Sequence, residues 1–135
     1  MKVKFLSLFS ALLWLSQSLL HFLLMLGLPL GRLVFGVAYI VFPLWLRPVN
    51  FLLFSLWAFF SFSYLAFGSW LKSGLRSSVL RKVILVGTVF LFLATVFNFF
   101  ISASPLEKYL TGSLTFLAFL SSSLLLYNKK KSYHD

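Results

Sequence analysis

The side chains of this chain that could do chemistry are few, and most of them stand inside apolar sequence. His21 and Gln17 are four residues apart, Asn98 lies in a later apolar run, and Glu107 is one of only two acids. An imidazole, a carboxamide and a carboxylate can hydrogen-bond a bound molecule, and an imidazole with a carboxylate can also transfer a proton. Ligand recognition is therefore the first chemistry to consider, and acid–base catalysis by His21 and Glu107 is the least favoured.

Other common chemistries lack their residues. The chain has no Cys, which removes disulfides, thiolate metal sites and cysteine nucleophiles. It has no glycine-rich phosphate loop, no Ser-His-acid set and no pair of carboxylates within reach of each other. No second His or acid stands near His21 at a metal-ligand spacing. We therefore expect a protein that is not an enzyme and that holds no metal and no cofactor.

The composition places these polar groups in a membrane. Of the 135 residues, 61% are hydrophobic and 10% charged, and the mean hydropathy is +1.00. A soluble chain of this length could not hide so much apolar surface in one core. The net charge of +10 comes from short basic clusters between apolar runs, which set membrane orientation and do not indicate nucleic-acid binding. The expected partners are the lipid bilayer and either a second membrane protein or further copies of the chain.

Four apolar segments are long enough to cross a bilayer, because about 20 apolar residues in a helix span its hydrocarbon core. They are residues 5–26, 49–71, 83–103 and 109–127, and none of them contains Asp, Glu, Lys or Arg. The predicted fold is all-α, a polytopic membrane protein with four transmembrane helices in a bundle and a short re-entrant or interfacial segment at about 27–48. Residues 1–135 then form a single integral membrane domain.

Residues 33–46 are the ambiguous element, since this run is short, contains Pro43 and lies between Arg32 and Arg47. If it does not cross, four helices put both termini in the cytoplasm of a bacterial cell, with nine basic residues inside and three outside. If it crosses, five helices put the N-terminus outside and the counts become eight and four. The link over residues 47–50 is too tight to join two full antiparallel spans comfortably, which favours four helices.

Each predicted helix carries polar and small residues on one side. The residues that share a face at helical spacing are Ser10, Gln17 and His21; Asn50, Ser61 and Gly68; Gly87, Ala94 and Asn98; and Thr111, Thr115, Ala118 and Ser122. Small residues let membrane helices approach closely, and hydroxyl groups hydrogen-bond across the contact. We therefore expect the four helices to pack along these faces.

The rarest polar groups converge on one end of the predicted bundle. At about 1.5 Å per residue, His21 lies roughly 24 Å and Asn98 roughly 22 Å from the cytoplasmic ends of their helices. Four more polar residues begin a helix or flank the intervening segment at that end: Asn50, Glu107, Arg32 and Arg47. We expect these six residues to form an outward-facing polar site under residues 27–48, which binds a small molecule or a lipid headgroup.

Each of these residues also has a purely structural interpretation. The run from Ser104 to Glu107 matches a capping box with Pro at the first helical position. A lone His in a helix is more often hydrogen-bonded structure than a ligand, and Arg32 and Arg47 can snorkel to the interface or pair with Glu107.

The order of the polar residues from Leu20 to Leu110 resembles that of a group of small bacterial membrane proteins of uncharacterised function. The resemblance rests on His21-x5-Gly27-x-Pro29-x-Gly31, then Pro43 and Leu46-Arg47, and later Asn98 and Ser104-x-x-Glu107. It implies a four-helix topology and a functional interest in His21, Arg47, Asn98 and Glu107, and it implies no activity. The chain departs from the pattern at Val37, where the group has a second Gly, and at Phe42, where it has Leu.

The preferred function is a non-enzymatic one: a membrane protein that binds a small ligand or lipid at its outer side, or that assists a larger complex. The alternative is a small oligomeric transporter or channel, and a further alternative is a holin-like protein that permeabilises the membrane. A proton-coupled exporter would be expected to hold a carboxylate inside a helix, and none of the four predicted spans has one.

Overall fold

Four long α-helices make up most of the chain in the computed structural model, which describes residues 2–37 and 39–131. Helix α1 covers Lys2–Met25, α2 covers Arg47–Phe67, α3 covers Ser77–Val96 and α4 covers Gly112–Lys131. A π-helical segment, η4 (Phe97–Ile101), continues α3, and a second one, η5 (Glu107–Thr111), leads into α4.

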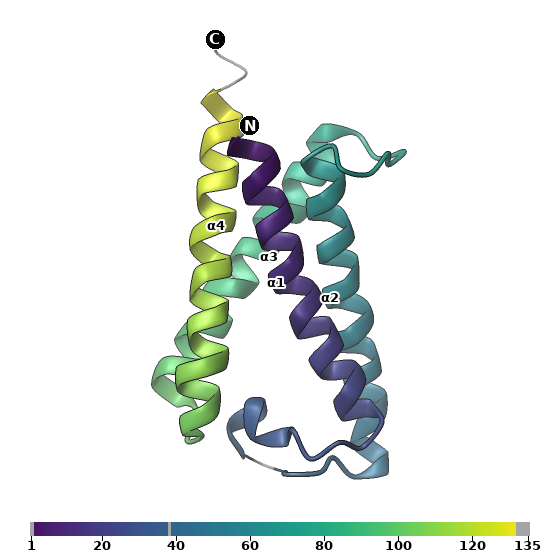
Figure 1. Cartoon of the computed structure of the whole chain (residues 1–135), viewed down its shortest axis with the longest axis vertical. Coiled ribbons are helices and arrows are strands. Elements are labelled where there is room, and N and C mark those ends of the chain that lie inside the picture. Colours follow the sequence, from purple (N-terminus) through teal and green to yellow (C-terminus); the bar gives the residue numbers. More distant parts are fainter. Residues whose placement is uncertain (1, 38, 132–135) are drawn as a thin grey trace.

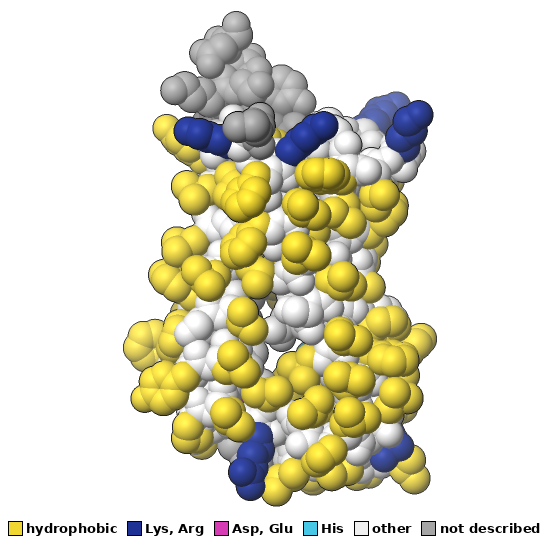
Figure 2. Space-filling view, viewed as in Figure 1, with side chains coloured by type: hydrophobic (Ala, Val, Ile, Leu, Met, Phe, Trp, Pro, Cys, Tyr) yellow, Lys and Arg dark blue, Asp and Glu magenta, His cyan; other side chains and the backbone are white. Residues whose placement is uncertain are grey.

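The four helices are long and apolar enough to cross a membrane, with candidate spans at Lys2–Met25, Leu44–Phe67, Ser77–Ile101 and Glu107–Asn128. Figure 2 shows hydrophobic side chains covering the middle of the molecule and Lys and Arg gathered near its two ends. Such a banded surface suits a bilayer, where charges stay in the headgroup regions. The predicted all-α, four-helix polytopic membrane protein is confirmed.

Helix ends do not coincide with the ends of the apolar runs. The second span was predicted to reach residue 71, but α2 ends at Phe67, where Ser69 takes a positive φ of 61° and the Trp70 amide bonds to the Leu65 carbonyl. The third helix was predicted from residue 83 but begins at Ser77. Apolar length reports the part of a helix that lies in lipid, whereas the backbone hydrogen bonds continue into the charged interface.

The helices form two pairs that diverge toward the end opposite the termini. In Figure 1, α1 runs alongside α2, while α4 lies beside α1 near the termini and moves away from it below. Helix α3 packs against both α2 and α4. The segment between α1 and α2 crosses this open end, so that it bridges the two pairs (Figure 1).

Hydroxyl groups join the helices along their polar faces, as predicted. The interhelical hydrogen bonds of these hydroxyls include Ser10 to Ser121 (2.7 Å), Tyr64 to Ser122 (2.6 Å) and Ser61 to the Ala11 carbonyl (2.8 Å) toward the closed end, where the termini lie, and Ser18 to the Phe54 carbonyl (2.9 Å) nearer the open end. Trp14, Phe60 and Tyr64 are buried beside them, and the Trp14 ring stacks on Phe60 and lies at a tilt to Tyr64. The polar faces thus form the interior of the bundle, where each hydroxyl has a partner other than lipid.

The described part of residues 26–46 forms no helix long enough to span a membrane, so the four-helix prediction is right and the five-helix alternative is wrong. The segment contains three short 3₁₀ turns, η1 (Gly31–Leu33), η2 (Phe35–Val37) and η3 (Leu44–Leu46). A hydrogen bond from the Gly31 amide to the Ile40 carbonyl (2.9 Å) closes a loop, and Leu24, Val34 and Phe42 form a small apolar core beneath it.

Candidate functional site

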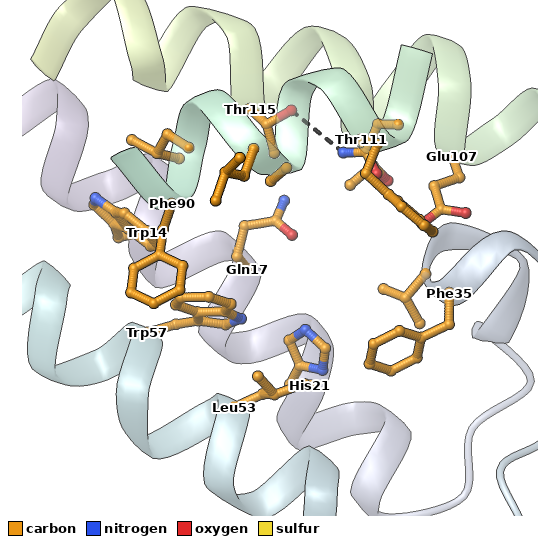
Figure 3. A pocket seen from close by; sticks show the side chains of 16 residues that line it. Trp14, Gln17, His21, Phe35, Leu53, Trp57, Phe90, Glu107, Thr111 and Thr115 are labelled. Atoms are coloured by element: carbon orange, nitrogen blue, oxygen red, sulfur yellow. Dashed lines mark hydrogen bonds between the residues drawn. The ribbon is translucent and has the colours of Figure 1, made fainter. Parts of the chain in front are cut away.

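A cavity of about 340 Å³ lies between the diverging helix pairs, at the end covered by the 26–46 segment. All four helices and the segment contribute to its wall. The 16 lining residues, drawn in Figure 3, are Trp14, Gln17, His21, Val34, Phe35, Leu53, Trp57, Phe90, Leu91, Leu93, Ala94, Phe97, Asn98, Glu107, Thr111 and Thr115.

His21 lines this cavity and is held from behind by Asn50. Its Nδ1 lies 2.9 Å from Oδ1 of Asn50, and the Asn50 amide nitrogen is 3.5 Å from the Leu46 carbonyl oxygen. Because an amide oxygen only accepts, Nδ1 carries the donated proton, and Nε2 is an acceptor in the neutral ring. Asn50 lines a smaller neighbouring pocket, so it positions the imidazole and does not face the main cavity.

Glu107 is 2% exposed and lies at the cavity wall, where the 26–46 segment meets the turn between α3 and α4. Its Oε2 accepts hydrogen bonds from the Gly36 amide (2.6 Å) and from the Ser102 hydroxyl (2.5 Å). The capping box forms only in part: the Glu107 amide donates to Ser104 Oγ (3.3 Å), but the carboxylate turns away toward the segment. Glu107 therefore links the 26–46 segment to the turn between α3 and α4, in addition to starting a helix.

Asn98 and Gln17 bring two carboxamides into the same cavity. Asn98 stands in the π-helical segment η4 and donates to Thr115 Oγ1 at 3.3 Å, which ties α3 to α4. Gln17 points into the space between Thr115 and His21 (Figure 3). Glu107 and Asn98 both stand in π-helical segments, and such segments, with one extra residue in a turn, frequently accompany functional sites.

The two arginines that were predicted to join the site do not line the cavity. Arg32 is exposed, and its backbone carbonyl accepts the Ser104 hydroxyl. Arg47 Nε lies 3.4 Å from the Phe42 carbonyl, and its guanidinium packs against Gly27. The hydrogen bonds of Glu107 described above come from Gly36 and Ser102, while the Arg47 side chain contacts both ends of the covering segment, at Gly27 and Phe42.

Aromatic side chains form much of the wall, and they were missing from the predicted site. Trp14, Trp57, Phe90 and Phe97 come from the helices. Phe35 comes from the covering segment, where its positive φ of 55° is unusual for a bulky residue, and its ring centroid is 6.1 Å from that of His21. The sequence pattern does not point to Phe35, because its ring reaches the cavity through an unusual backbone conformation.

The cavity reaches the side surface of the bundle. Two of its lining residues, Phe90 and Leu93, are 43% and 56% exposed and lie within α3, inside the third candidate span. On the opposite side, Figure 2 shows the face hollowed between α1 and α4 in the lower half of the molecule. A molecule dissolved in lipid could therefore approach the polar groups without leaving the membrane.

Chemically, the site offers one carboxylate, one imidazole, two carboxamides and two hydroxyls on an otherwise apolar wall. Within the described ranges, no group of three or more His, Cys, Asp or Glu residues is close enough to hold a metal ion. The arrangement suits recognition of a molecule with an apolar body and one polar group.

No protein-family model, no curated protein and no solved structure matches this chain. The fold confirms the four helices that the resemblance to small bacterial membrane proteins implied. The comparisons identify no family.

Proposed function

We propose that this polytopic membrane protein is not an enzyme and binds an amphipathic small molecule or lipid in the cavity between its diverging helix pairs. The observation that carries the proposal is the cavity itself: about 340 Å³ of space, walled mainly by apolar and aromatic side chains, with a few convergent polar groups at one end. Ligand pockets commonly have volumes of about 300–1,000 Å³ and this kind of lining.

The charge distribution supports an orientation with both termini in the cytoplasm of a bacterial cell. Nine Lys and Arg residues lie near the two ends of the sequence, in the α2–α3 turn and in the first turns of α3, against Arg32, Arg47 and Lys108 at the other end. In that orientation the polar end of the cavity lies in the outer half of the membrane. The ligand would then come from the outer leaflet or from outside the cell.

The experiment that tests the proposal fills the cavity and asks whether a bound molecule is lost. Ala94 lines the cavity, whereas Ala58 on α2 is partly buried and is not among the lining residues. Native mass spectrometry of protein released from nanodiscs should show a bound molecule on the wild type and on Ala58→Phe, and none on Ala94→Phe. Equal occupancy of the two variants, or a wild type that carries nothing, would contradict the proposal.

Transport is the second candidate, and one observation favours it. The predicted spans held no carboxylate, but the fourth candidate span begins at Glu107, which is almost completely buried and lines the cavity. A buried carboxylate of the kind that a proton-coupled transporter uses therefore stands at the start of this span. Binding is still preferred over a permeation path, because Trp14, Phe60 and Tyr64 fill the interior between the cavity and the closed end.

Flux measurements separate the two functions. Protein reconstituted in liposomes should show saturable binding but no movement of a cationic or neutral amphiphile across the bilayer. Movement that depends on Glu107 would favour the transporter.

A further inference from the structure

We propose that the ligand is an organic cation, in which an ammonium group on an apolar body binds at the Glu107 carboxylate. This inference rests on the proposed ligand-binding function and names the class of ligand. The first observation is the charge of the wall: among the 16 lining residues there is one carboxylate and no Lys or Arg. An anionic ligand would therefore meet no compensating side-chain charge, whereas a cation would meet one.

The second observation is the way in which the carboxylate is held. Both hydrogen bonds described for it, from the Gly36 amide and the Ser102 hydroxyl, end on Oε2. Neither of these bonds uses Oε1, and Glu107 lines the cavity (Figure 3). A carboxylate accepts hydrogen bonds on both oxygens, and a charged donor such as an ammonium makes the stronger bond.

The third observation is that the other polar groups also offer acceptors. His21 turns Nδ1 toward Asn50, which leaves Nε2 to accept, and the Gln17 side chain points into the space between His21 and Thr115 (Figure 3). A ligand that carries several N–H donors on one centre matches this arrangement. A ligand that offers only acceptors would leave Oε1 and Nε2 without partners, which is costly in a buried site.

The aromatic wall suits the same ligand. Trp57 lies within 6.4 Å of the His21 ring, and Phe35 within 6.1 Å of it, measured between ring centroids. The Glu107 carboxylate accepts from the Gly36 amide, next to Phe35, so a cation held there is near an aromatic side chain, and aromatic faces attract positive charge at distances up to about 6 Å. The apolar body would extend along Trp57 and Phe90 toward the exposed side of α3, where the cavity meets lipid.

The experiment uses tryptophan quenching, because two of the four Trp line the cavity and two do not. Trp45→Phe with Trp70→Phe leaves Trp14 and Trp57 as cavity reporters, and the reverse pair of substitutions leaves reporters of the surrounding lipid. The full-length chain is placed in phosphatidylcholine nanodiscs. Three terminally brominated probes of one chain length are then titrated: dodecylammonium, dodecanol and dodecanoate.

The expected result is that dodecylammonium quenches the cavity reporters at a concentration about tenfold lower than dodecanol, and that dodecanoate is weakest. Glu107→Gln should remove the advantage of the ammonium over the alcohol. Asp135→Asn removes the same formal charge at the last residue of the sequence and should leave the advantage intact.

Equal quenching by ammonium and alcohol in the wild type, or stronger quenching by the carboxylate, would overturn the cationic ligand while leaving the binding cavity standing. Failure of every probe to quench the cavity reporters beyond the lipid reporters would overturn the binding function as well. If Glu107→Gln does not fold, the ranking of the three probes on the wild type still decides the question.

Discussion

The side chains of His21 and Asn50 meet with Nδ1 of the imidazole 2.9 Å from Oδ1 of the amide. The bond joins the last turns of α1 to the first turn of α2, across the connection that covers the cavity. It also decides which ring nitrogen is free to face a ligand. One buried hydrogen bond thus serves both the packing of the first two helices and the chemistry of the site.

Asn50→Leu should lower the free energy of unfolding by about 1–3 kcal/mol, because it leaves the buried Nδ1 of His21 without a partner. Thermal unfolding in detergent, followed by size-exclusion chromatography, measures the loss. Ser55→Ala is the control, since Ser55 is exposed and bonds only to the Phe51 carbonyl of its own helix. A variant as stable as Ser55→Ala would show that the His21–Asn50 bond contributes nothing.

Tyr64→Phe and Ser122→Ala should be energetically coupled by about 0.5–1.5 kcal/mol, because their hydroxyls are 2.6 Å apart and Tyr64 is fully buried. A double-mutant cycle of unfolding free energies measures this coupling. A coupling near zero would mean that the hydrogen bond between Tyr64 and Ser122 does not stabilise the packing of α4 against α2. Ser123, whose hydroxyl bonds to its own helix at Phe119, provides an uncoupled partner for comparison.

Two neighbouring substitutions at the end of α2 should have opposite effects. A Cβ on Gly68 would overlap the Ser7 side chain, so Gly68→Ala should push α1 and α2 apart and destabilise the bundle by about 1–3 kcal/mol. Ser69 has a positive φ of 61°, so Ser69→Gly should stabilise by up to about 1 kcal/mol. Melting temperatures that move in the same direction for both variants would contradict this account.

Thiol labelling should divide the chain by side of the membrane, because the natural sequence has no Cys. Lys2→Cys and Ser78→Cys, both at exposed positions, should react from the cytoplasmic side, and Tyr39→Cys from the outer side. Ser7 and Ser104 are buried and would report poorly. Labelling of all three positions from one side would refute the four-span topology in the membrane.

The four helices and three of the residues that line the cavity could be predicted from the sequence. Helical spacing and the length of the apolar runs brought His21, Asn98 and Glu107 to one end of the bundle, because a helix converts residue number into depth. All three line the same cavity. Their role in binding a ligand stays a prediction.

What the sequence could not supply depends on irregular backbone. The direction of the Glu107 side chain is decided by Ser102 and by the amide of Gly36, which is distant in sequence and stands in a turn with no repeating pattern. The ring of Phe35 reaches the cavity through a positive φ that residue type disfavours. The sequence also could not show that Arg32 and Arg47 do not line this cavity, because charge alone does not say whether a side chain turns toward a cavity or toward the interface.

The distribution of hydrogen bonds along the chain has a consequence for the order in which the protein can assemble during synthesis. The bonds between α1 and α2, at Ser18, Ser61 and His21, lie within the first half of the chain, so this hairpin can form before the rest is made. The bonds that close the bundle need Ser121 and Ser122. A ribosome must therefore pass Ser122 before the bundle can close, and until α3 and α4 are made His21 and Gln17 face lipid or the insertion machinery.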